Sequence, residues 1–113
     1  MTDEQLYQYV TETIERERLF LDPMFDRQTI MGRFQLSKDR VGAIFSQSES
    51  GKLTNYIQHQ RLEYAAHLLL EQPERSIVQI AQESGFSSHN YFSDRFRQHF
   101  SMTPTEFRRS SLL

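Results

Sequence analysis

Cysteine is absent from the 113-residue sequence. Its absence excludes a disulfide framework and a thiolate metal site, and it suits a reducing compartment. No apolar run approaches the roughly 20 residues needed to span a bilayer, and the N-terminus lacks the basic start of a signal peptide. We therefore expect a soluble, cytoplasmic chain that makes no membrane contact.

Signals for β-strands and for catalysis are also scarce. β-branched residues are scattered without sustained alternation, which argues against a sheet. The sequence has no HExxH motif, no glycine-rich phosphate loop and no serine elbow. We therefore predict that the chain is not an enzyme, with no catalytic residues, no cofactor, no metal and no small-molecule site.

Positive charge is in slight deficit, which at first argues against nucleic acid as a partner. The formal net charge is -2, whereas phosphate-binding proteins are usually basic. The charges are unevenly distributed, because residues 1–26 hold seven acids against two arginines. Residues 27–113 hold eleven Lys and Arg against eight acids. The acidic front segment thus masks a mildly basic body.

The front segment has the periodicity of one amphipathic helix. Leu6, Val10 and Ile14 recur every four residues on a polar background. This pattern predicts a helix from Asp3 to about Phe20. The helix is either a connector to another domain or an extra packing helix.

Capping residues and helix breakers divide the rest of the chain into further helices. A Ser, Thr or Asp at a helix start can accept hydrogen bonds from the free N–H groups of the first turn. Glycine favours the left-handed turn after a helix end, and proline cannot continue a helix. On these signals we predict helices over 27–34, 38–47, 52–71, 77–84, 89–99 and from 104 onward, a loop over 46–51 ending on a left-handed Gly51, and a turn at Gly85.

The nine phenylalanines have two interpretations, a stacking platform for single-stranded nucleic acid or core packing. Helical spacing favours the second interpretation. We predict two small cores. One is formed by Phe34, Leu36, Val41, Ile44 and Phe45, and the other by Ile77, Ile80, Ala81, Phe86, Phe92, Phe96, Phe100 and Phe107.

Two segments of the chain repeat one another. Residues 30–45 and 80–96 share an apolar anchor, a tight turn, a serine cap and a second apolar stripe. Each predicts two helices joined by a turn, the plan of a helix-turn-helix. We therefore divide the chain into an acidic N-terminal helix or connector (1–26), a first helix-turn-helix (27–51), a linker helix (52–72) and a second helix-turn-helix with a C-terminal helix (73–113).

Several motifs have the order and spacing of a known family. They are Leu53-Thr-Asn-Tyr56-Ile57, Arg61-Leu62 to Leu68-Leu69, Ile80-Ala81, Gly85-Phe86-Ser87, Tyr91-Phe92-Ser93, Phe96 and Thr103-Pro104-Thr-Glu-Phe107-Arg108. In these motifs the sequence resembles the AraC/XylS family over about residues 27 to 110, most specifically after Leu53. The resemblance implies an all-α, homeodomain-like fold of two helix-turn-helix subdomains joined by a long linker helix, with an extra N-terminal helix here.

The resemblance also implies a function. Two recognition helices held about 34 Å apart can read successive major grooves on one face of double-stranded DNA. We expect regulation of transcription, with RNA polymerase as a candidate partner and nucleoid association when bound. Family members usually carry a second domain, so we expect a longer parent protein with a sensor or dimerisation domain. The alternative is a protein-interaction module that kept the fold but lost DNA binding.

In the second helix-turn-helix, polar residues lie opposite an apolar stripe of Tyr91, Phe92 and Phe96. We predict that Asn90 can pair with adenine and that Asp94 can accept from cytosine. The alternative is that these residues are exposed side chains with no role in DNA binding. The predicted base-reading residues of this helix are Ser88, His89, Asn90, Ser93 and Asp94, and the predicted backbone contacts are Arg95, Arg97, Arg108 and Arg109.

The first recognition helix is less polar, because Gly42 and Ala43 stand where long side chains are usual in the family. We predict base reading by Arg40 and by Ala43, the latter through thymine methyl groups, and backbone contacts by Lys38 and Ser46. Simple solvent exposure is the alternative.

The sequence departs from the family pattern at two positions where glycine is usual. Gln35 replaces a turn glycine, and Ser101 stands at a second such position. The first loop also has one extra residue before Gly51.

Two features of the linker helix stay open at this point. Arg61 either braces this helix against a recognition helix or touches a phosphate. His59, Glu63 and His67 recur at every fourth position, which would allow weak metal binding, but a solvated helix face is the default expectation.

Overall fold

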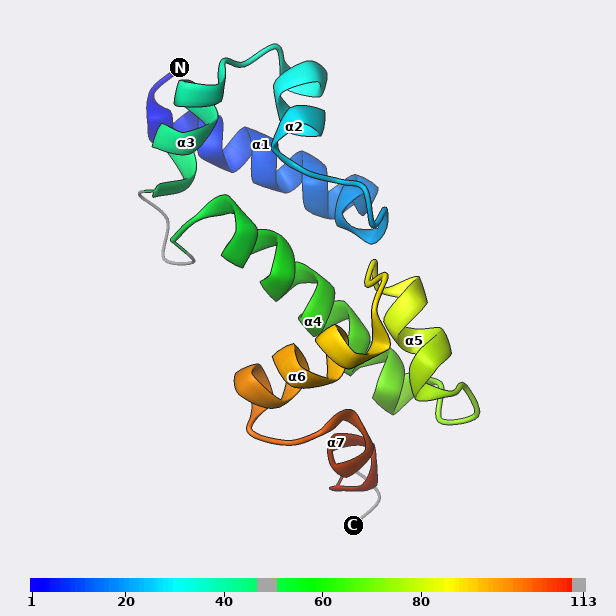
Figure 1. Ribbon diagram of the computed structural model, residues 1–113. Coiled ribbons are helices and arrows are strands. Elements are labelled where there is room, and N and C mark those ends of the chain that lie inside the picture. The colour runs from blue at the N-terminus through cyan, green and yellow to red at the C-terminus, as the bar shows by residue number, and fades with distance from the viewer. Residues whose placement is uncertain (47–50, 111–113) are drawn as a thin grey trace. The chain divides into compact units, whose positions relative to one another are not determined.

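The computed structural model describes residues 1–46 and 51–110, and these residues are folded into helices (Figure 1). They form seven α-helices and one 3₁₀ helix, with no strand in the described part of the chain. The elements are α1 (Asp3–Glu17), η1 (Leu19–Leu21), α2 (Arg27–Phe34), α3 (Lys38–Ser46), α4 (Leu53–Glu71), α5 (Ile77–Glu83), α6 (His89–Phe100) and α7 (Pro104–Ser110). The predicted all-α fold class is confirmed.

The chain folds as two compact units. The first comprises residues 1–60 and the second begins at Arg61, so that α4 contributes its first part to one unit and its second part to the other. Each unit contains a helix-turn-helix, α2–α3 in the first and α5–α6 in the second. Among the described residues, no helix is long and apolar enough to cross a membrane.

The core of the first unit is built on α1. Val10 and Ile14 are fully buried, and α1 packs against α3. The Phe45 ring of α3 lies with its centroid 5.3 Å from that of Tyr7 and 5.4 Å from that of Tyr56. These contacts show that α1 packs into the core of the first unit.

Helix α1 is shorter than the periodicity predicted. It ends at Glu17 because Arg18 adopts a left-handed conformation with φ of 55°, where the helical hydrogen bonding cannot continue. The apolar Phe20 that follows is buried from within the 3₁₀ helix η1. The prediction that the helix continues to about Phe20 was therefore wrong.

A buried tyrosine also joins α4 to α1. The Tyr56 hydroxyl donates to the Glu15 carboxylate at 2.6 Å, and only 3% of Tyr56 is exposed. Burial, together with the hydrogen bond to Glu15, raises the pKa of Tyr56 well above its usual range. Tyr56 therefore stays protonated and keeps its donor on the α1 carboxylate.

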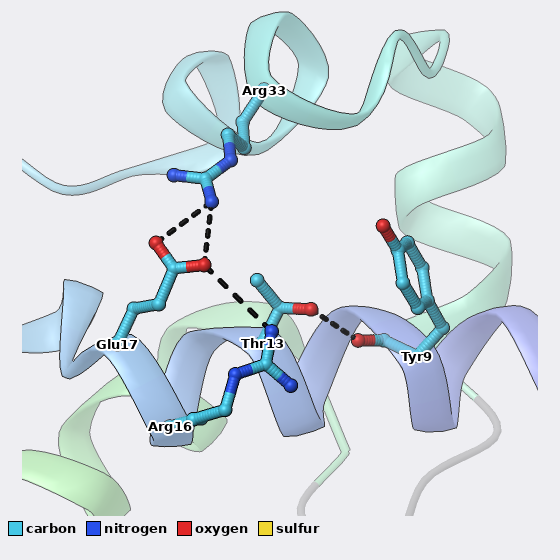
Figure 2. Close-up of polar contacts among 5 residues, drawn as sticks. All are labelled: Tyr9, Thr13, Arg16, Glu17 and Arg33. Atoms are coloured by element: carbon cyan, nitrogen blue, oxygen red, sulfur yellow. Dashed lines mark hydrogen bonds and ion pairs between the residues drawn. The ribbon is translucent and has the colours of Figure 1, made fainter.

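Helix α2 is held on α1 by an ion pair at the surface (Figure 2). The Arg33 guanidinium donates to both oxygens of the Glu17 carboxylate, at 2.7 and 2.6 Å. The hydrogen bond from Arg33 is the largest cause of a lowered Glu17 pKa. Figure 2 also shows the Thr13 hydroxyl donating at 2.9 Å to the Tyr9 carbonyl one turn earlier in α1.

The core of the second unit is a cluster of aromatic rings. The Phe96 ring lies 5.6 Å from Phe92, 4.5 Å from Phe100 and 5.3 Å from Phe107, measured between centroids. The second part of α4 packs on this cluster through residues such as Leu69, which is fully buried.

All nine phenylalanines of the chain are buried or half-buried. This burial supports the prediction of core packing over a stacking platform. Phe34 and Leu36, which we placed inside the first core, are only half-buried. The Phe34 ring meets the exposed Tyr9 ring edge-on, with 5.8 Å between centroids.

Several turns contain a residue in the left-handed backbone conformation. The predicted Gly51 and Gly85 have φ of 75° and 95°. Gln35 and Ser101, the two residues at positions where glycine is usual, have φ of 55° and 60°. The backbone thus keeps the glycine-like conformation with a side chain present. Ser46, the first residue of the predicted 46–51 loop, is the last residue of α3. Residues 47–50 of that loop lie outside the described residues.

Candidate nucleic-acid interface

Helix α3 begins at a serine cap, as predicted. The Arg40 N–H donates to the Ser37 hydroxyl at 3.1 Å. Val41, Ile44 and Phe45 are buried. Successive helical residues are rotated by about 100°, so the face opposite this buried stripe is made by Asp39, Gly42, Ala43 and Ser46.

This outer face of α3 is small and weakly polar. Gly42 and Ala43 are half-buried and Ser46 is exposed. The Ser46 hydroxyl donates to the Ala43 carbonyl at 3.0 Å, a bond within the helix. A β-carbon added at Gly42 would meet nothing within 4 Å, so the residue is not required by packing.

The two cations of α3 flank this face on opposite sides. Lys38 and Arg40 are both exposed. The Arg40 guanidinium lies 3.0 Å from the Asp3 carboxylate at the start of α1. The structure therefore places one predicted base-reading residue in an ion pair with the acidic front segment.

Helix α6 also begins at a serine cap. The Tyr91 N–H donates to the Ser88 hydroxyl at 3.2 Å. Phe92 and Phe96 face the core and are fully buried. Ser88, predicted to read bases, thus has a capping role in the free protein.

The side of α6 opposite its core is centred on Asp94, given the about 100° rotation per residue. Asn90 and Arg97 lie on one side of Asp94 within a turn of it, and all three are exposed. His89 is exposed and Ser93 half-buried, and both lie nearer the core edge. The structure thus gathers Asn90, Asp94 and Arg97 on one surface.

Tyr91 belongs to this outer surface, and its predicted place in the apolar stripe was wrong. It is 43% exposed, with its ring centroid 6.4 Å from that of Phe86. Arg95 Nε donates to the Tyr91 hydroxyl at 3.3 Å, and Arg95 Nη1 donates to Gln98 Oε1 at 2.9 Å. Tyr91 and Gln98 were not predicted as surface residues, although the helical rotation alone places both beside Asp94.

The two arginines of α7 differ. Arg109 is exposed, as a phosphate contact requires. Arg108 is half-buried, and its guanidinium donates to the Leu69 and Gln72 carbonyls at 3.1 and 3.2 Å. It therefore satisfies free carbonyls at the C-terminus of α4, and we leave it out of the interface although it was predicted there.

Helix α7 starts with a reciprocal cap. The Glu106 N–H donates to the Thr103 hydroxyl, and the Thr103 N–H donates to the Glu106 carboxylate, at 3.1 and 2.9 Å. The hydrogen bond from the Thr103 backbone is the largest cause of a lowered Glu106 pKa. This cap fixes the start of the helix that carries Arg109.

Two features of α4 were left open by the sequence, the role of Arg61 and the series of His59, Glu63 and His67. Arg61 is only 9% exposed, which argues against a phosphate contact. His67 pairs with Glu71 at 3.0 Å, and Glu63 pairs with His99 at 3.2 Å. Two of the three residues considered for a metal thus contact partners outside that set.

Comparisons with known proteins identify the fold. The family described as "Helix-turn-helix domain" matches residues 30–110. The HTH-type transcriptional activator RhaR of Mannheimia succiniciproducens is 38% identical over 105 residues, which cover 93% of this chain and 35% of RhaR. This chain therefore spans about a third of the length of that relative.

Solved structures agree with this match. A transcriptional regulator with an AraC-type DNA-binding domain from Chromobacterium violaceum superposes with a TM-score of 0.75 at 30% identity, covering 88% of this chain and 86% of that one. The DNA-binding domain of AdpA, solved with a target DNA, shares the fold with a TM-score of 0.79 at 20% identity, over 92% and 90% of the two chains. With two helix-turn-helix units and a family match over most of its length, the chain belongs to the AraC/XylS family of helix-turn-helix transcriptional regulators.

Proposed function

We propose that this chain binds double-stranded DNA sequence-specifically through the outer faces of α3 and α6, each in a major groove. The observation that carries the proposal is the exposed face of α6, where Asn90, Asp94 and Arg97 lie together opposite the buried Phe92 and Phe96. An amide, a carboxylate and a guanidinium on one helix face can distinguish base edges, because the major groove presents a different donor and acceptor pattern for each base pair.

Individual roles follow from side-chain chemistry. In α6, we assign Asn90 to adenine and Asp94 to cytosine N4, with Ser88, His89 and Ser93 as further base contacts. Tyr91 and Gln98, beside Asp94, join this reading surface.

The remaining contacts are assigned by charge and size. Arg95, Arg97 and Arg109 contact phosphates. In α3, Arg40 and Ala43 read bases, and Lys38 and Ser46 contact the backbone.

The role of the whole protein goes beyond DNA binding by this chain. We propose that the chain is the DNA-binding part of a longer cytoplasmic regulator, because it spans only 35% of RhaR. The remainder would carry a sensor or dimerisation domain, and the bound protein would recruit or block RNA polymerase at the nucleoid.

A salt titration tests the central part of the proposal. Fluorescence anisotropy with a labelled duplex, from about 50 to about 200 mM salt, should show affinity falling steeply, because phosphate contacts release counterions. A duplex selected from a random library should bind more tightly than a scrambled one at every salt concentration. Binding that is absent, or insensitive to both salt and sequence, would refute DNA recognition and favour a protein-interaction module.

A further inference from the structure

The acidic helix α1 meets the first recognition helix at one defined contact. The Asp3 carboxylate lies 3.0 Å from the Arg40 guanidinium, with 37% and 42% of the two side chains exposed. Both residues belong to the first unit, where α1 packs against α3.

Asp3 is held in place although it lies close to the N-terminus. The Gln5 N–H donates to the Thr2 hydroxyl at 3.1 Å, and the Thr2 N–H donates to the Gln5 side chain at 3.0 Å. This reciprocal cap fixes the first turn of α1. The buried Val10 and Ile14 then anchor the same helix in the core. The carboxylate is therefore presented to α3 by a structured element.

The contact with Asp3 changes the net charge of the α3 surface. The helix has two cations, Lys38 and Arg40, and one acid, Asp39. Adding Asp3 brings the charge of this surface to zero, whereas a DNA-binding surface gains affinity from each unpaired cation. An exposed ion pair is weak in water, so a phosphate or a guanine can compete for the guanidinium.

We infer that Asp3 is a positioning residue that holds Arg40 on α1 and limits the contribution of the first recognition helix to DNA binding. This inference rests on the proposed function and adds an internal competitor for one of its contacts. In the free protein Arg40 is paired with Asp3. On DNA, Arg40 must leave Asp3, and the lost ion pair offsets part of the energy gained from the nucleic acid.

Asp3→Asn tests the inference, because it removes the charge and keeps the size of the side chain. The matched control is Glu12→Gln, which removes one exposed charge from the same helix. Glu12 lies nine residues further on, a distance of about 14 Å along the axis, which exceeds the screening length of roughly 8 Å at physiological salt. Far-UV circular dichroism should show both variants folded like the parent chain.

We expect Asp3→Asn to tighten binding to the selected duplex at low salt by about two- to fivefold, the range of an exposed ion pair. The slope of log affinity against log salt should also steepen, because salt screens the Asp3–Arg40 ion pair that opposes binding in the parent chain. Glu12→Gln should change both quantities less. In an Arg40→Gln background, the additional effect of Asp3→Asn over Glu12→Gln should vanish.

Three results would overturn the inference while leaving DNA binding intact. Asp3→Asn could equal Glu12→Gln, it could weaken binding, or its effect could persist without Arg40. Failure of the proposed function looks different, because then neither the parent chain nor any variant responds to salt or to duplex sequence.

Discussion

The outer faces of the two recognition helices differ much more than their buried faces do. In α3 the outward positions hold Asp39, Gly42, Ala43 and Ser46, while α6 presents Asn90, Tyr91, Asp94, Arg97 and Gln98. Both helices bury an apolar stripe and begin at a serine cap. The shared features maintain the fold, so the differing outer residues are where the two helices can diverge in DNA recognition. We expect α6 to read more of the sequence than α3.

The arginines of the two recognition helices also differ in their partners. Arg40 of α3 pairs with Asp3 on another helix. Arg95 of α6 lies over the Tyr91 ring, 5.6 Å from its centroid, and donates to Gln98 of its own helix. A cation–π contact leaves the charge of Arg95 uncancelled, whereas the carboxylate cancels that of Arg40. The difference strengthens the expectation that α6 contributes more to DNA affinity.

The largest expected effect is a loss of stability that distinguishes the core of the second unit from that of the first. Phe96 is fully buried among three other phenylalanine rings. Phe96→Ala should cost about 3 to 5 kcal/mol of unfolding free energy in urea, because it removes a large ring and leaves a cavity. Amide hydrogen exchange should show protection lost first between residues 61 and 110. Equal loss in α1 and α3 would show that the two units do not unfold separately.

The second largest effect is a loss of DNA affinity, and it compares base reading by α6 with base reading by α3. Asn90→Ala should cost about 1 to 3 kcal/mol on the preferred duplex and little on a scrambled one, because it removes a paired amide. Ala43→Gly, the matched truncation in α3, should cost less. Competition gel shifts with both duplexes measure the difference. If the Asn90 variant lost affinity equally on both duplexes, the asparagine would not be reading bases.

A structural arginine can be told from a phosphate-binding one within α7. Arg108→Ala should lower unfolding free energy by about 1 to 2 kcal/mol, because the α4 carbonyls lose a charged donor. Arg109→Ala should leave stability nearly unchanged and reduce the salt slope by about one unit. Urea unfolding and anisotropy titrations check the pair. A stability loss confined to Arg109→Ala would reverse the two assignments.

Smaller gains in stability are expected at the two non-glycine residues in left-handed turns, one in each unit. Gln35→Gly and Ser101→Gly should each stabilise the protein by up to about 1 kcal/mol, because glycine accepts positive φ without strain. Thermal unfolding of the two single variants and of the double variant gives the comparison. A decrease in melting temperature would indicate that the lost side chain had stabilised its turn.

The smallest effect concerns pH and the surface pair that joins α2 to α1. The Glu17 pKa is lowered in the folded protein, so the stabilising contribution is present above the unfolded pKa of about 4.3. This contribution is lost as pH falls through the folded value. Glu17→Gln should therefore flatten the decline in melting temperature between about pH 5 and pH 3. An unchanged acid profile would show that the pair with Arg33 does not contribute.

Local signals predicted the fold well, because a helix cap depends on residues three or four apart. Ser37, Ser76 and Thr103 all accept hydrogen bonds from the backbone at the predicted starts of their helices. The glycine-like turns at Gln35 and Ser101 followed from the family pattern and have positive φ. Such features require no knowledge of tertiary contacts.

Other features of the site depended on tertiary contacts that no spacing encodes. The periodicity of Val10 and Ile14 predicted a buried face but did not identify α3 as its partner. Arg108 contacts carbonyls 36 and 39 residues earlier in the chain, and Arg40 contacts Asp3. Tyr91 was misplaced for a different reason, because it adjoins a buried phenylalanine but lies on the outward side of α6.

The most direct test of DNA recognition by two helices is a hydroxyl-radical footprint on a duplex selected by this chain. We predict two protected segments on one face of the DNA, centred about one helical turn or 10 to 10.5 base pairs apart. The segment whose protection weakens in Asn90→Ala should be the one assigned to α6. A single protected segment, unchanged in extent by variants in α3, would contradict the proposal that both helices contact DNA.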